Sequence, residues 1–275
     1  MIEDGVIDAV VRQLMSGKEA MVFVVRCGEE VRCAKVYKEA TERSFRQAVD
    51  YTENRKTKNT RQARAMAKGT RFGRESQERA WQSAEVDALY RLAAAGVRVP
   101  KPYNFHEGVL LMELVTDEHG DAAPRLNDVE FTPGEAQRFH HALVMEVVRM
   151  LCAGVIHGDL SEYNILLGAD GPVIIDLPQA VDAAGNNHAA RMLARDVGNL
   201  REFFGGFAPE LLATDYANEI WALYEAGELT PDAALTGRFE RVEKEVDLEG
   251  VVREIDDAML EERARRMRIA EAAEP

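Results

Sequence analysis

The sequence predicts an α+β fold of two lobes, a small antiparallel-sheet N-terminal lobe and a mainly helical C-terminal lobe. Three observations lead to this prediction. Two apolar, β-branched runs near the N-terminus flank a short glycine turn, which is typical of a β-hairpin. A helix-start motif near residue 132 precedes apolar residues at helical spacing, and two short strand-like runs follow. With 275 residues, 46% of them apolar, the chain is long enough to bury a substantial core.

The first predicted element is the hairpin. Residues 21–25 and 31–37 form its strands, and Gly28 lies in the turn between them. This arrangement places Lys35 near the end of the second strand. A lysine inside an apolar strand needs an explanation, because ammonium groups are rarely buried without a partner.

A basic stretch follows over about residues 41–74. Residues 41–79 contain eleven Lys/Arg and five Asp/Glu, inside a chain whose net charge is −14. Its polar sequence without periodicity predicts a flexible insert. The acidic chain as a whole argues against general nucleic-acid binding, whereas the stretch leaves a local anionic partner open; a solvated loop is the simpler interpretation.

A helix is expected from about Glu75, because apolar residues recur at helical spacing until Gly96 ends it. Glu85 lies on or beside the buried face of this helix. A strand-like run at 109–115 and the polar loop after it mark a lobe junction, so we assign the N-terminal lobe to residues 1–115.

The C-terminal lobe is assigned to residues 116–237. Thr132, Pro133 and Glu135 have the spacing of a helix N-cap, first position and capping box. Short strands are expected at 165–167 and 173–175, followed by helices. Residues 238–275 contain eight Lys/Arg and twelve Asp/Glu, which predicts a charged helical tail.

The cellular location is expected to be the cytosol. Cys27, Cys33 and Cys152 are too few and too widely spaced for a disulfide framework or a four-ligand zinc site. No leader-like segment opens the chain, and no window approaches the roughly 18 apolar residues of a membrane span. We therefore expect no membrane partner.

The strongest functional pattern is a polar loop followed by a strand and an aspartate. Asp159, Asn164 and Asp176 carry it. Phosphoryl transfer needs such groups, because the protein mainly positions a nucleophile, phosphates and metal. Asp159 would take the proton of the accepting hydroxyl, while Asn164 and Asp176 supply the oxygen ligands that Mg²⁺ prefers. Each residue alone could simply shape a loop, but the complete spacing favours chemistry.

A second pattern precedes the hairpin. Ser16, Gly17 and Lys18 form a small turn whose N–H groups could approach nucleotide phosphates. Lys35 could reach the same phosphates while Glu85 holds it by a charge-assisted hydrogen bond. Alone this pattern is weak, because such turns are commonly plain surface.

Together these residues resemble the RIO family of atypical serine protein kinases, and within it the Rio1 branch. The likeness runs from about Ser16 to about Phe204. Its most specific strings are Leu160-Ser161-Glu162-Tyr163-Asn164 and Ile175-Asp176-Leu177-Pro178-Gln179-Ala180-Val181, with further matches at 16–20, 33–38, 97–102, 110–113 and 195–197.

The resemblance implies a two-lobed protein-kinase-like fold that binds ATP and Mg²⁺, with Mn²⁺ as an alternative ion, between the lobes. It implies that Lys35 binds phosphate and pairs with Glu85, and that Asp159 accepts the proton. It also implies that Asn164 and Asp176 bind the metal ion. The peptide links of Met112, Glu113 and Val115 would form the hinge that binds adenine. We further assign Asp196 to bracing the catalytic loop from a helix start, although an N-cap role would look identical in sequence.

The resemblance also implies transfer of the γ-phosphate to a serine hydroxyl, most readily the protein's own, or to water through a phosphorylated Asp176. The protein substrate could be the chain itself or an unidentified protein. A ribosomal particle or RNA is a further implied partner, because the family is linked to small-subunit maturation. One departure concerns the phosphate turn, where Met15-Ser16 stands in place of the family's Ser-Thr.

Two other functions stay open. A small-molecule kinase of the aminoglycoside or choline type shares the His-Gly-Asp-Leu loop, although Leu177-Pro178 after Asp176 favours the RIO pattern. A nucleotide-gated, non-catalytic assembly factor is the second alternative, although the intact polar residues favour an enzyme.

Overall fold

The computed structural model of the chain describes residue 1 and residues 5–17, 20–38 and 84–240. Met1–Arg238 forms one compact unit. Lys18, the insert predicted at about 41–74, residues 75–83 of the predicted helix and residues 241–275 of the predicted tail lie outside the described residues. The predictions about them, and the lobe boundaries given above, stay predictions.

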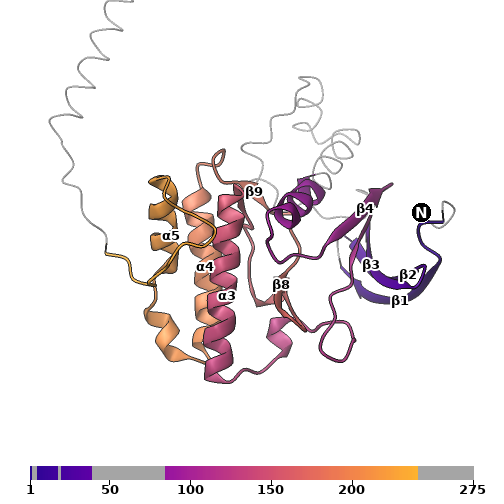
Figure 1. Cartoon of the computed structure of the whole chain (residues 1–275), viewed down its shortest axis with the longest axis horizontal. Helices are drawn as coiled ribbons and strands as arrows, with labels where there is room; N and C mark the ends of the chain where they lie inside the picture. Colours follow the sequence, from indigo (N-terminus) through magenta and orange to yellow (C-terminus); the bar gives the residue numbers. More distant parts are fainter. Residues whose placement is uncertain (2–4, 18–19, 39–83, 241–275) are drawn as a thin grey trace, which may run out of the picture. The chain divides into compact units, whose positions relative to one another are not determined.

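The N-terminal lobe is built on a five-stranded antiparallel sheet in the order β1-β2-β3-β5-β4 (Figure 1). The predicted hairpin is confirmed as β2 and β3, with Gly28 at a φ of 64° in the turn. Lys35 in β3 faces Leu110 in β5 across the ladder. The strands are β1 (Ala9–Ser16), β2 (Ala20–Cys27), β3 (Glu30–Tyr37), β4 (Pro102–His106) and β5 (Val109–Glu113).

Two strands of this sheet were not predicted from the sequence, and both lie at its edges. β1 is exposed along most of its length, so it lacks the alternation of a half-buried strand. β4 begins with Pro102, a residue that sheets tolerate at edges. The predicted strand at 109–115 ends earlier, because residues 114–115 leave the sheet after Glu113.

A helix over residues 84–94 packs on one face of the sheet and ends in a turn at Gly96, as predicted. Its buried residues Val86, Leu89 and Leu92 share a core with Leu110. The opposite face of the sheet has a separate small core of Ile7, Val25, Ala34 and Leu111.

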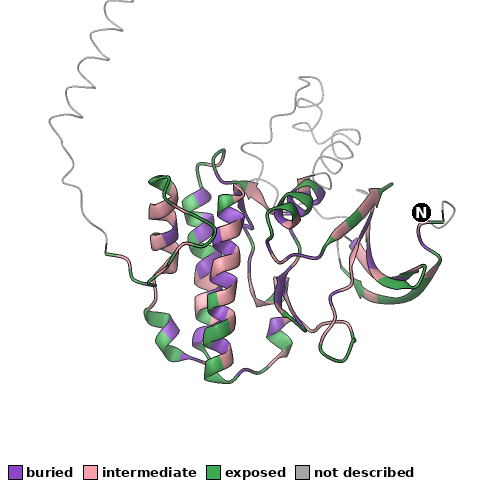
Figure 2. Cartoon of the chain, in the orientation of Figure 1, coloured by how far each residue is buried: buried purple, intermediate pink, exposed green. Residues whose placement is uncertain are grey.

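The C-terminal lobe is mainly helical, with α3 (Pro133–Cys152), α4 (Ala189–Gly205) and α5 (Tyr216–Glu225) side by side (Figure 1). The capping box is confirmed, because Thr132 N–H donates to Glu135 Oε2 at 2.9 Å and Glu135 N–H donates to Thr132 Oγ1 at 3.4 Å. The buried stripe of α3 faces its neighbours (Figure 2). No helix in the described part of the chain is long and apolar enough to cross a membrane.

Short elements connect these helices. The predicted strand pair is confirmed as β7 and β8, which pair in antiparallel register from Ile165↔Ile174 to Gly168↔Gly171. The short elements are η2 (Leu126–Asp128), β6 (Val155–Ile156), η3 (Glu162–Asn164), β7 (Ile165–Gly168), β8 (Gly171–Ile174), β9 (Val181–Asp182) and η4 (Pro209–Ala213).

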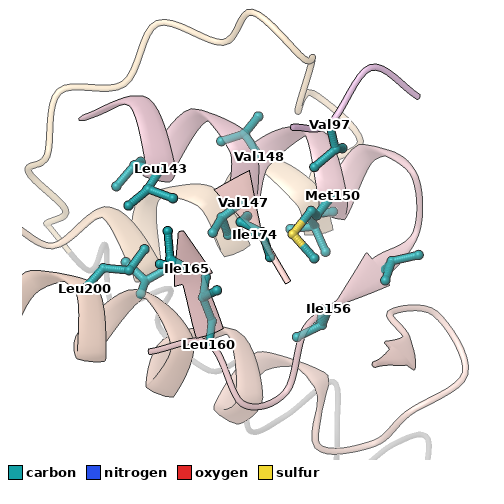
Figure 3. Close-up of a cluster of buried hydrophobic side chains, with 14 of the residues drawn as sticks. Val97, Leu143, Val147, Val148, Met150, Ile156, Leu160, Ile165, Ile174 and Leu200 are labelled. Carbon is teal, nitrogen blue, oxygen red and sulfur yellow. The ribbon is translucent and has the colours of Figure 1, made fainter. Parts of the chain in front are cut away.

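The largest core lies where α3, α4 and the β7–β8 pair meet (Figure 3). Leu143, Leu160, Ile165, Ile174 and Leu200 are fully buried there. Burial of each such side chain stabilises the fold by about 1.5–3 kcal/mol. Because Leu160 lies within the polar loop at 157–164 and Ile165 directly follows it, this core fixes the loop relative to α4.

Candidate active site

The loop that carries Asp159 lies between β6 and β7 and is held by α4. Asp196 accepts hydrogen bonds from the N–H groups of Gly158 (2.7 Å) and Leu160 (3.1 Å), and Asn199 Nδ2 donates to Leu160 O at 2.8 Å. Asp196 is buried, which raises the pKa of its carboxyl although both N–H groups favour the ionised form. The predicted brace is confirmed. Its predicted place at a helix start is wrong, because residue 196 lies in the middle of α4.

Further bonds fix the loop from inside. Asn164 Nδ2 donates to Asp159 O at 2.8 Å, which leaves the Asn164 Oδ1 as an acceptor. His157 is 2% exposed, and its Nε2 lies 3.0 Å from Ile175 O, so it braces the loop as predicted. Ile175 N–H donates to Asn164 O at 2.9 Å, which ties the segment before Asp176 to the loop.

Asp159 itself is exposed at the surface of the loop. Gln179 Nε2 donates to Asp159 Oδ2 at 3.4 Å. This approach requires Gly158, because a Cβ atom there would lie 2.7 Å from Gln179 O, and because the φ of Gly158 is 81°.

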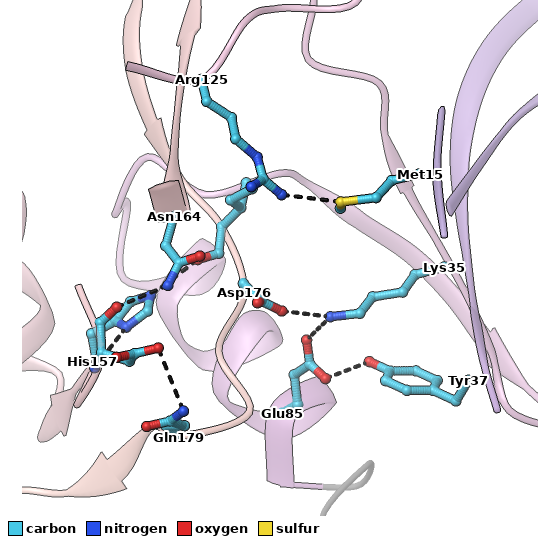
Figure 4. A network of polar contacts seen from close by, with 11 residues as sticks. Met15, Lys35, Tyr37, Glu85, Arg125, His157, Asn164, Asp176 and Gln179 are labelled. Atoms are coloured by element: carbon cyan, nitrogen blue, oxygen red, sulfur yellow. Dashed lines mark hydrogen bonds and ion pairs between the residues drawn. The ribbon is translucent and has the colours of Figure 1, made fainter. Parts of the chain in front are cut away.

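Lys35, Tyr37, Glu85 and Asp176 form an ion cluster between the two lobes (Figure 4). Lys35 Nζ lies 2.5 Å from Glu85 Oε1 and 2.9 Å from Asp176 Oδ1. Tyr37 Oη donates to the other Glu85 oxygen at 2.8 Å. Burial opposes the charge on Lys35, but the two carboxylates outweigh it and raise the pKa of the ammonium. Burial and the Glu85 charge raise the pKa of Tyr37, so its hydroxyl keeps the proton that it donates.

Asp176 has an unusual backbone conformation. Its φ is 66°, in the left-handed region that few residues other than glycine adopt. Its side chain is 47% exposed. Partial burial works against ionisation, but Lys35, followed by His157 and Arg125, lowers the pKa of the carboxyl. Non-glycine residues with this backbone conformation are enriched at functional sites.

The turn predicted to approach phosphate is partly closed on itself. Ser16 ends β1, and Gly17 N–H donates to Ala20 O at 2.9 Å. The Gly17 amide is therefore occupied within the turn. Lys18, predicted for the same role, lies outside the described residues.

The segment predicted to bind adenine comprises the end of β5 and the residues directly after it. Arg98 binds the Glu113 carboxylate with two hydrogen bonds of 2.8 and 2.9 Å, and this contact lowers the pKa of Glu113. Glu113 N–H donates to Lys101 O, and Val115 O accepts from Ala123 N–H. Within the described residues the Val115 N–H has no hydrogen-bond partner, so it is one donor available to a ligand here. Met112, three residues earlier, is half-buried.

Asp176 and Asn164 are the oxygen donors available for a metal ion. In the described ranges no cluster of three or more His, Cys, Asp or Glu side chains could hold an ion by itself. This donor set fits Mg²⁺, which proteins commonly bind through one or two carboxylates while substrate phosphates and water complete the shell. It does not fit a metal that needs an all-protein cage.

Sequence reasoning did not give a role to Tyr37, Arg98, Arg125 or Gln179, which all contact residues of the site or its margin. For Tyr37 a signal existed, because strand periodicity places it on the same face as Lys35, two residues earlier. The contacts of Arg98, Arg125 and Gln179 join segments far apart in sequence, so no local pattern indicates them.

Comparison with known proteins places the chain in a family. A family model described as the RIO domain matches residues 21–217. A RIO-type serine/threonine-protein kinase Rio1 of Haloferax volcanii is 37% identical over 208 residues, which cover 74% of this chain and 66% of that protein. The chain belongs to the RIO domain family.

Other relatives support the Rio1 branch of the RIO family. The Rio1 of Methanocaldococcus jannaschii is 34% identical over 69% of this chain and 60% of its own length. The rio1 kinase of Schizosaccharomyces pombe is 35% identical over 46% of this chain and 25% of its own. The match to this chain thus spans less than two thirds of the length of these curated relatives.

The fold is that of RIO kinases. A crystal structure of the Rio2 kinase of Chaetomium thermophilum, described as an ADP/Mg²⁺-phosphoaspartate complex, matches with a TM-score of 0.53 at 24% identity. The match covers 90% of this chain and 72% of the other. The predicted two-lobed kinase-like α+β fold is confirmed.

Proposed function

We propose that this chain is an atypical, ATP-dependent serine/threonine protein kinase that transfers the γ-phosphate of ATP to a serine hydroxyl. One observation carries the proposal. The ammonium group of Lys35, in a strand, lies 2.5 Å from Glu85 of a helix and 2.9 Å from Asp176 of the segment after β8. The RIO-type kinases named among the relatives support the same activity.

In this proposal the adenine lies against the peptide links of Met112, Glu113 and Val115. Val115 N–H would donate to a ring nitrogen, and Glu113 would contribute only backbone groups because Arg98 already binds its carboxylate. Lys35 would donate to phosphate oxygens while Glu85 keeps its ammonium in place. Ser16, Gly17 and Lys18 stay proposed phosphate contacts of the turn.

Asp176 and Asn164 would hold Mg²⁺, or Mn²⁺ in its place, beside the phosphates. The ion, when bound, neutralises charge on the phosphate oxygens. Support for this pairing comes from the ADP and Mg²⁺ in the Chaetomium Rio2 complex. The ionised state of Asp176 suits a metal ligand.

Asp159 would act as the general base. The oxygen of the serine hydroxyl forms a bond to the γ-phosphorus, the bond from that phosphorus to the β-γ bridging oxygen breaks, and the hydroxyl proton passes to Asp159. Gln179 would orient the Asp159 carboxylate through its 3.4 Å contact. The substrate would be the chain itself or another protein.

An ATPase cycle is a second candidate, favoured by the exposure of Asp176. Its ionised carboxylate would attack the γ-phosphorus, the bond from that phosphorus to the β-γ bridging oxygen would break and ADP would leave, which gives an acyl phosphate. Water would then hydrolyse the acyl phosphate to inorganic phosphate and the free carboxylate. The phosphoaspartate in the Chaetomium Rio2 complex supports this route. A ribosomal particle or RNA is proposed as a partner through the family alone.

The test measures self-labelling and phosphate release from γ-labelled ATP with Mg²⁺, in wild type, Asp159→Ala and Asp176→Asn, with Asp232→Ala as an exposed control. We expect both site variants to lose at least about 100-fold in rate. Label that survives hydroxylamine is on serine, whereas label released by it is an acyl phosphate. Label on an added aminoglycoside or choline, with none on the protein, would indicate a small-molecule kinase. ATP binding without turnover would indicate an assembly factor.

A further inference from the structure

The described site has few cations for a ligand that carries several negative charges. Glu85, Asp159 and Asp176 contribute three carboxylates, and Lys35 is the ammonium that already contacts two of them. The Gly17 amide is occupied by Ala20 O. Among the described residues, a further donor on this side of the protein would therefore favour a bound nucleoside triphosphate, in addition to any metal ion and to the proposed contacts of the turn.

Arg125 is well placed by its backbone. It forms an isolated β-bridge with Leu166 in β7, two residues after Asn164. Its carbonyl accepts from Asp128 N–H at 3.0 Å, and the preceding Pro124 carbonyl accepts from Leu167 N–H at 2.8 Å. These bonds fix the base of the side chain relative to the metal-ligand candidates Asn164 and Asp176.

The side chain of Arg125 reaches across to the phosphate turn. Its Nη2 lies 3.1 Å from Met15 Sδ, the residue directly before Ser16 (Figure 4). Its charge is also close enough to Asp176 to contribute to the lowered pKa of that carboxyl, after burial and Lys35. No Asp or Glu within the described ranges forms an ion pair with Arg125.

A thioether is a weak hydrogen-bond acceptor, so this guanidinium contacts a poor partner. Phosphate oxygens accept charge-assisted hydrogen bonds that are shorter and roughly twice as strong as neutral ones, and arginine matches their geometry with two parallel donors. Exchange of the Met15 contact for a phosphate contact is therefore favourable. Met15 occupies a position where the family pattern has a residue with a hydroxyl group. The Arg125 guanidinium therefore places a phosphate donor beside the position at which this chain lacks that hydroxyl.

We propose that Arg125 is a binding residue for the nucleotide, and that its guanidinium leaves Met15 to contact the terminal phosphate groups. The inference rests on the proposed nucleotide-dependent function. It adds a cation from the C-terminal lobe, opposite the turn and Lys35, which both belong to the N-terminal lobe.

The experiment compares the binding of ATP, ADP and adenosine by isothermal titration calorimetry, in the presence of Mg²⁺. The variants are Arg125→Ala and Arg125→Lys. Arg138→Ala is the matched control, because it removes an exposed arginine of α3 whose guanidinium lies 4.9 Å from the Phe139 ring centre. We expect Arg125→Ala to weaken ATP binding about tenfold and adenosine binding less than about twofold, with Arg125→Lys between wild type and Arg125→Ala.

Each outcome has a separate meaning. The role of Arg125 would be overturned if Arg125→Ala bound ATP as tightly as the control variant, or if it lost ATP and adenosine affinity equally. Turnover of ATP by the wild type would in either case leave the kinase proposal intact. A wild type that binds none of the three ligands would overturn the proposed function itself. A loss for ATP but not for ADP would place the contact at the γ-phosphate.

Discussion

The polar loop at 157–164 and the ion cluster of Lys35, Tyr37, Glu85 and Asp176 are neighbours, but they are held in different ways. The loop is fixed through its backbone by buried side chains of α4, within one lobe. The cluster is fixed by side-chain charges from both lobes. The backbone bonds of the loop join protein groups only, whereas the Lys35 ammonium gives two of its three donors to Glu85 and Asp176 and would have to share them with a bound phosphate.

This difference separates two tasks. The loop presents Asp159 in one position in advance, which is the arrangement that proton transfer requires. In the cluster, Lys35 is instead held by ion pairs, and a phosphate or a metal ion can replace these contacts. We therefore expect changes at the loop brace to affect folding first, and changes in the cluster to affect ligand handling first.

The largest effect is expected for Asp196→Ala. It leaves the N–H groups of Gly158 and Leu160 buried without an acceptor, which should lower the free energy of unfolding by about 4 kcal/mol. Urea unfolding measures it. Asp196→Asn keeps one acceptor and should lose about half as much. Equal stability of Asp196→Ala and wild type would mean that the loop is not held by this carboxylate.

The next effect is expected for Lys35→Met, in the cluster. Loss of the ammonium removes the contact to phosphate and should lower kcat/KM for ATP by about 100-fold, which corresponds to about 3 kcal/mol at the transition state. Lys35→Arg should recover part of it, because the charge returns with a different reach. If Lys35→Met lost folding stability but no activity, the cluster would be a structural device like the loop brace.

One buried histidine, His140, is expected to make the stability of the fold depend on pH, which matters when activity is compared at different pH values. His140 is buried in α3 against Phe204 and Tyr216, near Arg201 and His141, and its Nε2 has no partner within the described residues. Burial, followed by the charges of His141 and Arg201, lowers the pKa of His140 from 6.5 to about 4.

Because the folded-state pKa is depressed, the stability that neutral His140 provides is complete above pH 6.5 and is lost as pH falls toward 4. Wild type should lose about 2 kcal/mol more than His140→Phe between about pH 7 and about pH 5. Thermal unfolding of both proteins at each pH checks this. Parallel acid profiles would show that another group controls acid unfolding.

The smallest effect is expected for Tyr37→Phe. It removes the 2.8 Å hydrogen bond to Glu85 but leaves the Lys35 contact, so the free energy of unfolding should fall by about 1 kcal/mol. We expect KM for ATP to rise a few-fold while kcat changes less, because Glu85 then holds Lys35 less firmly. A fall in kcat with unchanged KM would assign Tyr37 to the chemical step instead.

Most of the framework was predictable from local patterns. The hairpin with Lys35, the Thr132 capping box and the β7–β8 pair each depend on residues that are close in sequence, and all three are confirmed. The edge strands β1 and β4 were not predicted, because edges lack the burial pattern that identifies a strand.

The site was predictable as a set of residue types but not as a network. The spacing of Asp159 and Asn164 is local. The pairing of Lys35 with Glu85 was predicted from the residue types and supported by the resemblance, and Asp196 was assigned to the loop brace. The contact between Arg98 and Glu113, and the positions of Gln179 and Arg125, result from tertiary packing between segments that no short motif connects. A single sequence holds no direct record of such pairs.

The left-handed backbone at Asp176 limits which side chains this position can carry. Only glycine, asparagine and aspartate adopt that conformation at little cost. Glutamate would keep the negative charge and still be a poor replacement, because its longer side chain comes with a strained backbone. Asparagine is therefore the substitution that removes the charge with little change in backbone cost. In a library randomised at residue 176, aspartate, asparagine and glycine should be enriched among the most stable sequences despite the exposure of the side chain.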